Sequence, residues 1–350
     1  MRKLNYIPFM LILVLGIIIV TGSCFRTKNP LGADHEIRVV ADSTIWQQAE
    51  PILKDIFERV EYIPQPEKEF KIIKADLHNF KRFKNIIFLS TLDAEDKISA
   101  NINSNLAEDA KRKVESGYII FVKKNEWADY QVVMFLIGLD LSSLLTKIEE
   151  QRSEIFFQFE DYWNKFHEEI LYGYKEQIDV EKHLLKSYSW MIRVPSDFRL
   201  EIQSAKDRFV MFRRNIPPRW FAIYWLEAND PNVITKQWCI AKRNEIGKKF
   251  FEGELVEQDY DDVKAEEVIF LNRRALKLKG LWKNADEKTD PAGGPFRLYC
   301  FFDEPTERIY FIDMHLFYPG FKKRKLHYLR QMEIVANTFK TNLEVKLDDI

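Results

Sequence analysis

Few residues in this chain have both the types and the spacing that a known catalytic chemistry needs. His167-Glu168-Glu169 begins like the zinc-protease helix motif, but Leu171 occupies the position one turn later where a second histidine is required. The sequence contains no G-x-S-x-G nucleophile turn, no P-loop and no G-x-G-x-x-G. None of the six histidines pairs with another at ligand spacing. We therefore expect no catalytic residue, metal or cofactor, and the sequence leans away from an enzyme.

Two weaker groupings could bind a ligand or a partner. Gly293-Gly294-Pro295 combines residues that permit positive φ with one that fixes φ, which predicts a tight turn before a strand at Phe296. Alternatively, its backbone amides face a ligand beside Trp282 and Arg273.

The second grouping is the basic run 322–325, which opens the last predicted helix. Its cations oppose the helix dipole. They are either solvated or in contact with anionic headgroups or a protein. Together, these two groupings define a candidate ligand or partner surface made of Arg273, Trp282, Gly293, Gly294 and Arg324.

Cys24 is the residue with the clearest chemistry. Arg2 and Lys3 precede an unbroken apolar run over residues 7–20, and small residues at 21–23 lead into the cysteine. A basic start, an apolar stretch and a small-residue end are the parts of an export signal. The pattern resembles a lipobox, where a signal peptidase cuts before a diacylglyceryl-modified cysteine that can also carry palmitate. We expect residues 1–23 to be removed and Cys24 to become the lipidated N-terminus.

Two alternatives to lipidation remain open. Thr21 stands where a leucine is more usual, and counting back to Tyr6 lengthens the apolar stretch, so an uncleaved signal anchor is one alternative. Ordinary cleavage leaving a free Cys24 is the other. All three place the body outside the cytoplasm, because the basic residues hold the N-terminus inside. We expect a cell-envelope protein facing the periplasm, at either the inner or the outer membrane.

Composition narrows the class of partner. The chain has 350 residues and 46% hydrophobic residues, enough for two domains with substantial cores. The formal net charge is −1, and removing Arg2 and Lys3 with the leader gives −3. We expect no nucleic-acid partner, because such proteins carry a basic balance or stripe. The expected partners are the membrane, through the lipidated N-terminus, and an envelope protein.

The chain has three cysteines, so a lipidated Cys24 leaves Cys239 and Cys300 as its thiols. An oxidising envelope permits a disulfide between them. Separation along the sequence does not reveal the distance between their Cα atoms. We interpret both as buried small apolar residues and leave the bridge open.

The body divides into two halves with different patterns. After a tether over residues 24–35, an N-terminal α/β domain over 36–174 alternates short apolar strands with helices. The expected strands are 36–41, 70–74, 85–91 and 118–122. The expected helices are 43–60, interrupted by Pro51, one capped by Ser104 and closed by Gly117, and a long helical stretch over 126–171 broken near Gly138 and Asp140.

The second half, residues 175–350, predicts an antiparallel sheet packed with helices. Strands are expected at 188–195, 209–214, 220–226, 268–272, 275–282, 296–302 and 308–317, and helices at 232–250 and 324–339. Residues 303–306 form a turn that joins the last two strands as a hairpin. The fold class of the whole chain is α+β.

Several short motifs follow one another along the chain in a familiar order: Trp46, Pro64-Gln65-Pro66, Gly280-Leu281-Trp282, Gly293 to Phe296, and Tyr318-Pro319. With the leader ending at Cys24, they resemble a family of envelope lipoproteins of diderm bacteria known as domain of unknown function 4837, over nearly the whole mature chain. The resemblance implies an exported lipoprotein and brings no activity with it. The second half is also similar to the PsbP/Mog1-type modules, which usually bind partners.

The sequence thus favours a lipid-anchored envelope protein that serves as a binding or assembly module. An envelope hydrolase acting on glycan or lipid is the alternative, because two ordinary carboxylates can do such work without a motif. A structural subunit of a larger envelope complex, held through the long helix or the Gly293 segment, is the third hypothesis.

Overall fold

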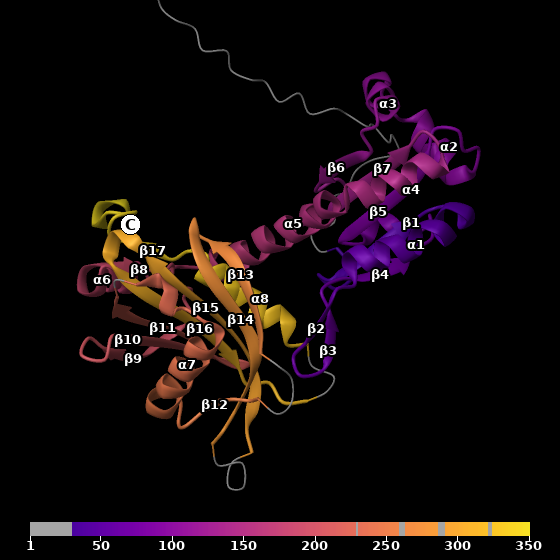
Figure 1. Cartoon of the computed structure of the whole chain (residues 1–350). Coiled ribbons are helices and arrows are strands. Elements are labelled where there is room, and N and C mark those ends of the chain that lie inside the picture. The colour runs from indigo at the N-terminus through magenta and orange to yellow at the C-terminus, as the bar shows by residue number, and fades with distance from the viewer. Residues whose placement is uncertain (1–29, 229, 259–262, 286–290, 321–323) are drawn as a thin grey trace, which may run out of the picture. The chain divides into compact units, whose positions relative to one another are not determined.

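The chain folds into two compact units. The computed structural model describes residues 30–228, 230–258, 263–285, 291–320 and 324–350 (Figure 1). The first unit comprises the described residues up to Arg59 together with Phe70–Tyr162, and the second comprises Val60–Glu69 with Trp163–Ile350. Helix α5 (Arg152–Tyr172) carries the chain from the first unit into the second. Among the described helices, none has the length and apolarity needed to cross a membrane.

The first unit is an α/β layer structure. Its sheet has the order β4-β1-β5-β7-β6, in which neighbours pair in parallel except at the edge strand β6. Its strands are β1 (Glu36–Val40), β4 (Lys71–Lys74), β5 (Asn85–Thr91), β6 (Ile120–Lys124) and β7 (Val132–Gly138). Its other helices are α1 (Ser43–Phe57), α2 (Lys97–Ser104), α3 (Glu108–Glu115) and α4 (Leu141–Glu150).

Helices cover both faces of this sheet, which is why its central strands are apolar throughout. Strands β5 and β7 are buried at every position. On one face, Phe88 and Phe135 stack with ring centroids 4.9 Å apart and pack against Ile102 of α2 and Val114 of α3. Helices α1 and α4 pack against each other and cover the other face. Two-sided burial of this kind is characteristic of parallel sheets.

Three predictions in the first half were wrong in detail. Residues 132–138 form strand β7 rather than helix, because a strand buried on both faces lacks the alternation that marks most strands. Ser104 ends α2 instead of capping the next helix, which starts at Glu108. Helix α1 runs through Pro51 without a break, since its apolar face, including Leu53, is fully buried and offsets the lost hydrogen bond.

The second unit is built on one large antiparallel sheet, as predicted. Its strand order is β12-β14-β15-β16-β11-β10-β9, with β13 pairing to β14. The strands are β9 (Arg199–Ser204), β10 (Phe209–Asn215), β11 (Pro218–Glu227), β12 (Leu255–Val256), β13 (Lys264–Phe270), β14 (Arg273–Lys283), β15 (Gly293–Asp303) and β16 (Arg308–Leu316). Its remaining elements are α6 (Ile178–Tyr188), α7 (Lys236–Phe250), α8 (Leu326–Ala336), β8 (Trp190–Met191) and β17 (Lys340–Thr341). The chain is therefore α+β.

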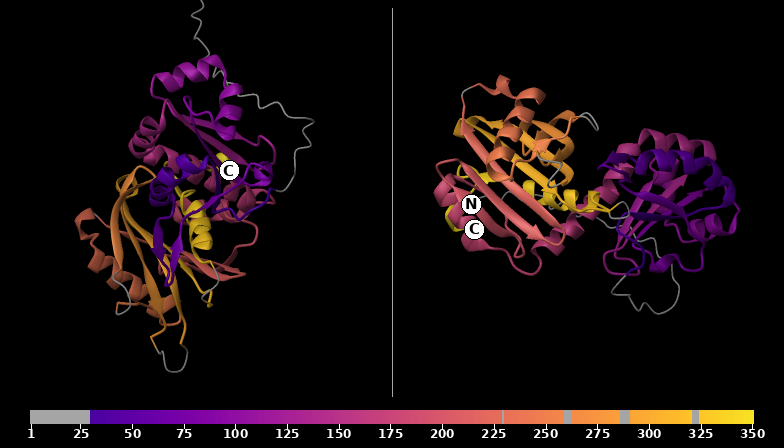
Figure 2. Two further views of the ribbon diagram at one scale, coloured as in Figure 1. Left: turned by 90° about the vertical axis from the view of Figure 1, so that its right-hand side faces the viewer. Right: turned by 90° about the horizontal axis from the view of Figure 1, so that it is seen from below.

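Strand β15 shows how this sheet is covered on both faces. Leu298 and Cys300 lie in one apolar cluster with Cys239 of α7. The alternate residue Tyr299 donates a hydrogen bond to Glu333 of α8, so α7 and α8 lie on opposite faces of the sheet (Figure 2). The expected turn after β15 and the hairpin to β16 are both present.

A short hairpin of the second unit comes from within the sequence of the first. Strands β2 (Val60–Tyr62) and β3 (Pro66–Lys68) pair in antiparallel fashion, and Val60–Glu69, which we call the hairpin arm, clusters with the second unit. The path of the chain therefore passes between the units three times, at Arg59–Val60, Glu69–Phe70 and Tyr162–Trp163. The sequence did not predict the arm, because its strands are only three residues long.

Other corrections in the second unit are local. The predicted strand 188–195 shrinks to β8, because helix α6 runs to Tyr188 and pairing with β17 covers only Trp190 and Met191. The predicted strand 268–272 starts earlier, at Lys264, and ends at Phe270. Leu271 and Asn272 have φ of 49° and 64°, which makes them the two-residue turn of a hairpin into β14.

Candidate functional site

One concentration of titratable groups is a buried quartet, which we call the His315 cluster: Arg243, Glu254, Asp313 and His315. Helix α7 supplies Arg243, the segment after α7 supplies Glu254, and β16 presents Asp313 and His315 two residues apart on one face. The exposed fraction of each of these residues is 6% or less. All four groups are therefore removed from solvent.

The cluster is arranged around the carboxylate of Asp313. His315 Nδ1 lies 3.0 Å from Asp313 Oδ1, and Arg243 Nε lies 2.7 Å from Oδ2. Glu254 sits farther out, with its oxygens 3.8 Å from both His315 Nε2 and Arg243 Nη2. The Arg243 guanidinium also stacks on Phe296, 4.2 Å from the ring centroid.

Burial and charge act oppositely on the two acids. Burial raises the pKa of Glu254, and the nearby charges of His315 and Arg243 only partly offset that effect. Burial also tends to raise the pKa of Asp313, but the Arg243 charge and the His315 hydrogen bond outweigh it and hold that pKa below its usual value. Two acids with pKa values pushed apart are a known arrangement for general acid and base chemistry.

Access limits what this chemistry could act on. The cavity beside Arg243 and Asp313 has a free volume of about 10 Å³ and is lined mainly by apolar side chains such as Phe209 and Leu298. That volume is about the space for one water molecule. In the described conformation the His315 cluster therefore joins α7 to the sheet by ion pairs and offers no room for a substrate.

A second ionic group lies on the opposite face of the sheet. We call it the Glu333 cluster: Glu61, Lys277, Arg297, Tyr299 and Glu333. Arg297, 3% exposed, bonds both Glu61 of the hairpin arm and Glu333 of α8. Tyr299 Oη donates to Glu333 at 2.9 Å, and Lys277 Nζ lies 2.5 Å from the same carboxylate.

The Glu333 cluster fixes its charge states strongly. Burial alone would raise the pKa of Glu333, but the charges of Arg297 and Lys277 dominate and lower it to about 2. Burial and the Glu333 charge together raise the pKa of Tyr299 above its ordinary value, so its hydroxyl stays protonated. The cluster is thus a fixed network of charges that ties the hairpin arm and α8 to β15.

The hairpin arm also caps α8. The Glu67 carboxylate accepts hydrogen bonds from the backbone N–H groups of Lys325 and Leu326, at 2.8 and 3.1 Å. An acidic side chain at this end of a helix satisfies unpaired donors and interacts favourably with the helix dipole. The basic residues at the start of α8 oppose its helix dipole, and the Glu67 carboxylate offsets that unfavourable charge.

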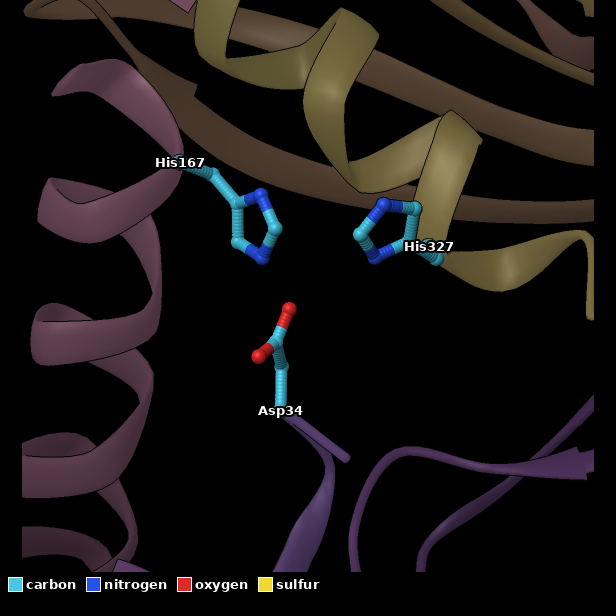
Figure 3. Close-up of side chains that lie close together, drawn as sticks. All are labelled: Asp34, His167 and His327. Carbon is cyan, nitrogen blue, oxygen red and sulfur yellow. The ribbon is translucent and has the colours of Figure 1, made fainter. Parts of the chain in front are cut away.

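His167 and His327 come together although 159 residues separate them in sequence. Figure 3 shows their rings facing one another from α5 and α8. Their ring centroids are 4.7 Å apart, and Gln331 Nε2 lies 3.2 Å from one nitrogen of each ring. Asp34, also drawn there, belongs to the first unit, where its carboxylate lies 2.6 Å from Lys84 Nζ.

This pairing was not indicated by the spacing of the histidines along the chain. Two imidazoles supply half of the ligands of a tetrahedral zinc site. Within the second unit the two rings contact each other edge to face, and Gln331 is hydrogen-bonded to both. The incomplete zinc motif on α5 stays incomplete, because Leu171 is a buried apolar residue of that helix.

The predicted glycine turn is part of a strand instead. Gly293 and Gly294 are the first residues of β15, opposite Lys283 and Trp282 of β14. A Cβ on Gly294 would come within 2.0 Å of the carbonyl oxygen of Leu316. The glycines are needed for close approach between strands, not for positive φ, and Trp282 beside them is 3% exposed.

The remaining members of the predicted surface lie elsewhere. Arg273 is at the other end of β14 and pairs with Asp303 at 2.6 Å and Glu344 at 2.8 Å. Arg324 donates to the backbone carbonyls of Lys68 and Glu69 in the hairpin arm. The structure thus brings Trp282, Gly293 and Gly294 together and separates Arg273 and Arg324 from them.

The cysteines divide between the described and the remaining residues. Cys239 and Cys300 are both free thiols and fully buried, as interpreted from the sequence. The leader over residues 1–23, Cys24, the start of the tether and the cations Lys322 and Lys323 lie outside the described residues.

Comparison with known proteins gives family matches without an activity. Residues 177–338 match the family model described as "Domain of unknown function (DUF4837)", and residues 31–170 match "Domain of unknown function (DUF8532)". The suspected family is thereby confirmed for the second half, while the first half matches a separate model. No curated protein matches the chain in sequence.

Solved structures of Mog1 are among the structural matches. These are the crystal structure of the Saccharomyces cerevisiae Ran-binding protein Mog1p and a single-residue mutant of protein Mog1. Each is 10% identical, with a TM-score of 0.30, and covers 44% of this chain and 90% of its own. The fold of the second unit is established by its own sheet and not by these matches.

Proposed function

Residues 177–338 of this chain carry a DUF4837 domain, and we propose that the protein is an exported lipoprotein. It is held to an envelope membrane through Cys24 and serves as a binding or assembly module. The single observation that carries the proposal is the leader, in which Arg2 and Lys3, the apolar run over residues 7–20 and small residues end at Cys24.

The anchor is strong enough to hold the protein. Each buried methylene of an acyl chain contributes about 0.8 kcal/mol, and two or more chains give durable attachment where one gives only reversible binding. The segment between Cys24 and β1 spans at most ~40 Å when extended. The folded body therefore works close to the membrane surface.

A binding or assembly role is supported by how the second unit uses its charged groups. Arg297, Asp313 and Glu333 are each committed to partners within the fold. The cavity beside the His315 cluster has room for about one water. Charged groups paired inside the fold hold its helices and strands in one arrangement, and a fixed arrangement suits recognition.

Lipid labelling tests the anchor. Cells that express the full chain are grown with radiolabelled palmitate, and the protein is isolated from total membranes. We expect label on the wild type and none on Cys24→Ala, which should leave the membrane fraction or remain unprocessed. Cys239→Ala is the matched control, because it removes a buried thiol and leaves Cys24 in place.

Two outcomes would reject the lipoprotein. An unlabelled wild type together with an equally membrane-bound Cys24→Ala protein would support the uncleaved signal anchor. Intact, unprocessed protein in the cytosolic fraction would reject export altogether.

The second candidate is an envelope hydrolase that acts on glycan or lipid. The observation that favours it is the approach of two carboxylates, Glu254 and Asp313, to the imidazole of His315. This function requires the cluster to open, because the described cavity holds about one water. Purified protein incubated with labelled peptidoglycan or phospholipid should release no product if the binding role is correct. Release that disappears in His315→Ala would establish the hydrolase.

A further inference from the structure

We propose that Cys239 and Cys300 form an intramolecular disulfide in the exported protein, joining α7 to strand β15. The inference rests on the proposed function in one respect, since export supplies the oxidising compartment. The bridge is a modification site within the second unit and is independent of the lipid on Cys24.

The fold brings the two cysteines into one cluster. Cys300 lies on the face of β15 that α7 covers, and Cys239 lies on the face of α7 that packs there. Both side chains are 0% exposed and belong to one apolar cluster with Leu298 and Phe311. Contact with the Cys239 thiol adds to burial in raising the pKa of Cys300, so the two sulfur atoms are close neighbours.

The number of thiols limits the pairings that are possible. The chain has three cysteines, and thioether formation at Cys24 would leave two. Those two come from segments 61 residues apart, yet the fold packs them into the same cluster. No competing pairing within one molecule remains.

The oxidant for this bridge is a thiol oxidoreductase that carries a disulfide. One cysteine thiolate attacks the oxidoreductase disulfide, which forms a mixed disulfide and releases one oxidoreductase thiolate. The other cysteine thiolate then attacks the mixed disulfide and displaces the second. Cys239 and Cys300 together lose two protons and two electrons, and the oxidoreductase disulfide is reduced to a dithiol.

Burial sets the order of events. An oxidoreductase cannot reach either sulfur once α7 covers the sheet, so oxidation occurs while the chain is folding. The same burial then protects the bridge from reduction. We therefore expect the native protein to keep its bridge under mild reductant and to lose it only when denatured.

Thiol counting on the full-length protein tests the inference. Envelope fractions are denatured and treated with a polyethylene-glycol maleimide, with and without prior reduction. The wild type should gain no label before reduction and two after it. Cys239→Ala and Cys300→Ala should each gain one label in both conditions. Two labels on exported, unreduced wild type would overturn the inference while leaving export intact.

A second measurement does not depend on export. Full-length protein purified in detergent is unfolded, then refolded in a glutathione redox pair. We expect bridged monomer and a Tm higher by about 5–10 °C than after reduction. Either single variant should lose this redox-dependent part of the Tm as completely as the double variant does. Two free thiols at the oxidising end of the series would overturn the inference wherever the protein resides in the cell.

Discussion

The two units solve the same packing problem with different chemistry. The first buries continuous apolar strands, as in β5 and β7, between layers of helices. The second places charged side chains on both faces of its central strands, with Arg297 on one face and Asp313 and His315 on the other. Burial of apolar side chains stabilises almost any well-packed arrangement, whereas buried charges are stable only in the arrangement that pairs them. We therefore expect the second unit to tolerate fewer alternative packings than the first.

The largest expected effect comes from breaking the Glu333 cluster. Arg297→Met leaves Glu61 and Glu333 buried without their shared cation, which should cost the second unit about 4 kcal/mol of stability. Hydrogen exchange of peptides from β15 and α8 would measure the loss.

The matched change in the first unit is Lys84→Met. Its partner Asp34 is 29% exposed and can be hydrated, so the loss should be about 1 kcal/mol. Equal losses from the two substitutions would contradict the contrast between the units.

The first unit should respond instead to a lost apolar contact. Leu136 of β7 is 0% exposed, and Leu136→Ala should cost about 3 kcal/mol through lost burial and the cavity left behind. Leu139→Ala, at a position 41% exposed, is the control and should change stability by less than about 0.5 kcal/mol. Exchange in peptides from β5 should rise for the first substitution alone.

Acid should destabilise the second unit selectively. The pKa of Glu333 is lowered from its usual 4.5 to about 2, so its contribution is fully present above about pH 5 and is lost as pH falls toward 2. The loss should approach 3 kcal/mol, and Glu333→Gln should remove this part of the pH dependence. Denaturant unfolding between pH 6 and 2.5 would show it. An unchanged pH profile in Glu333→Gln would assign the acid sensitivity to other groups.

The smallest effect concerns the start of α1. Asp42 accepts a hydrogen bond from the Thr44 backbone N–H at 2.7 Å, so Asp42→Ala should cost the first unit about 1 kcal/mol. Asp42→Asn keeps the accepting oxygen and should stay within a few tenths of a kcal/mol of the wild type. A loss as large in Asn as in Ala would show that charge, not the cap, matters there.

Much of the fold could be predicted because most elements have a local signal. Strand β5 matches its predicted bounds, and strands β10, β11, β14, β15 and β16 and helix α7 fall where apolar patterns place them. Strand β7 was missed because its run of apolar residues has no period that separates strand from buried helix.

The clusters could not be predicted because their members are distant in sequence. Arg297 bonds to Glu61, which is 236 positions away in the sequence, and His167 bonds to Gln331, which is 164 positions away. Only Asp313 and His315 are close enough to suggest a shared face, and no spacing indicates that Arg243 or Glu254 joins them. Local patterns specify elements, while long-range polar contacts depend on the topology that joins those elements.

The hairpin arm has a consequence for how the two units are inherited. Val60–Glu69 lies within the sequence of the first unit but packs with the second. A gene fragment that begins after α5 would therefore encode the large sheet without Glu61, the partner of Arg297, and helix α8 without Glu67, which caps it. A single cut or recombination point cannot give two whole units. The halves are therefore expected to pass through evolution as one piece, in spite of matching separate family models.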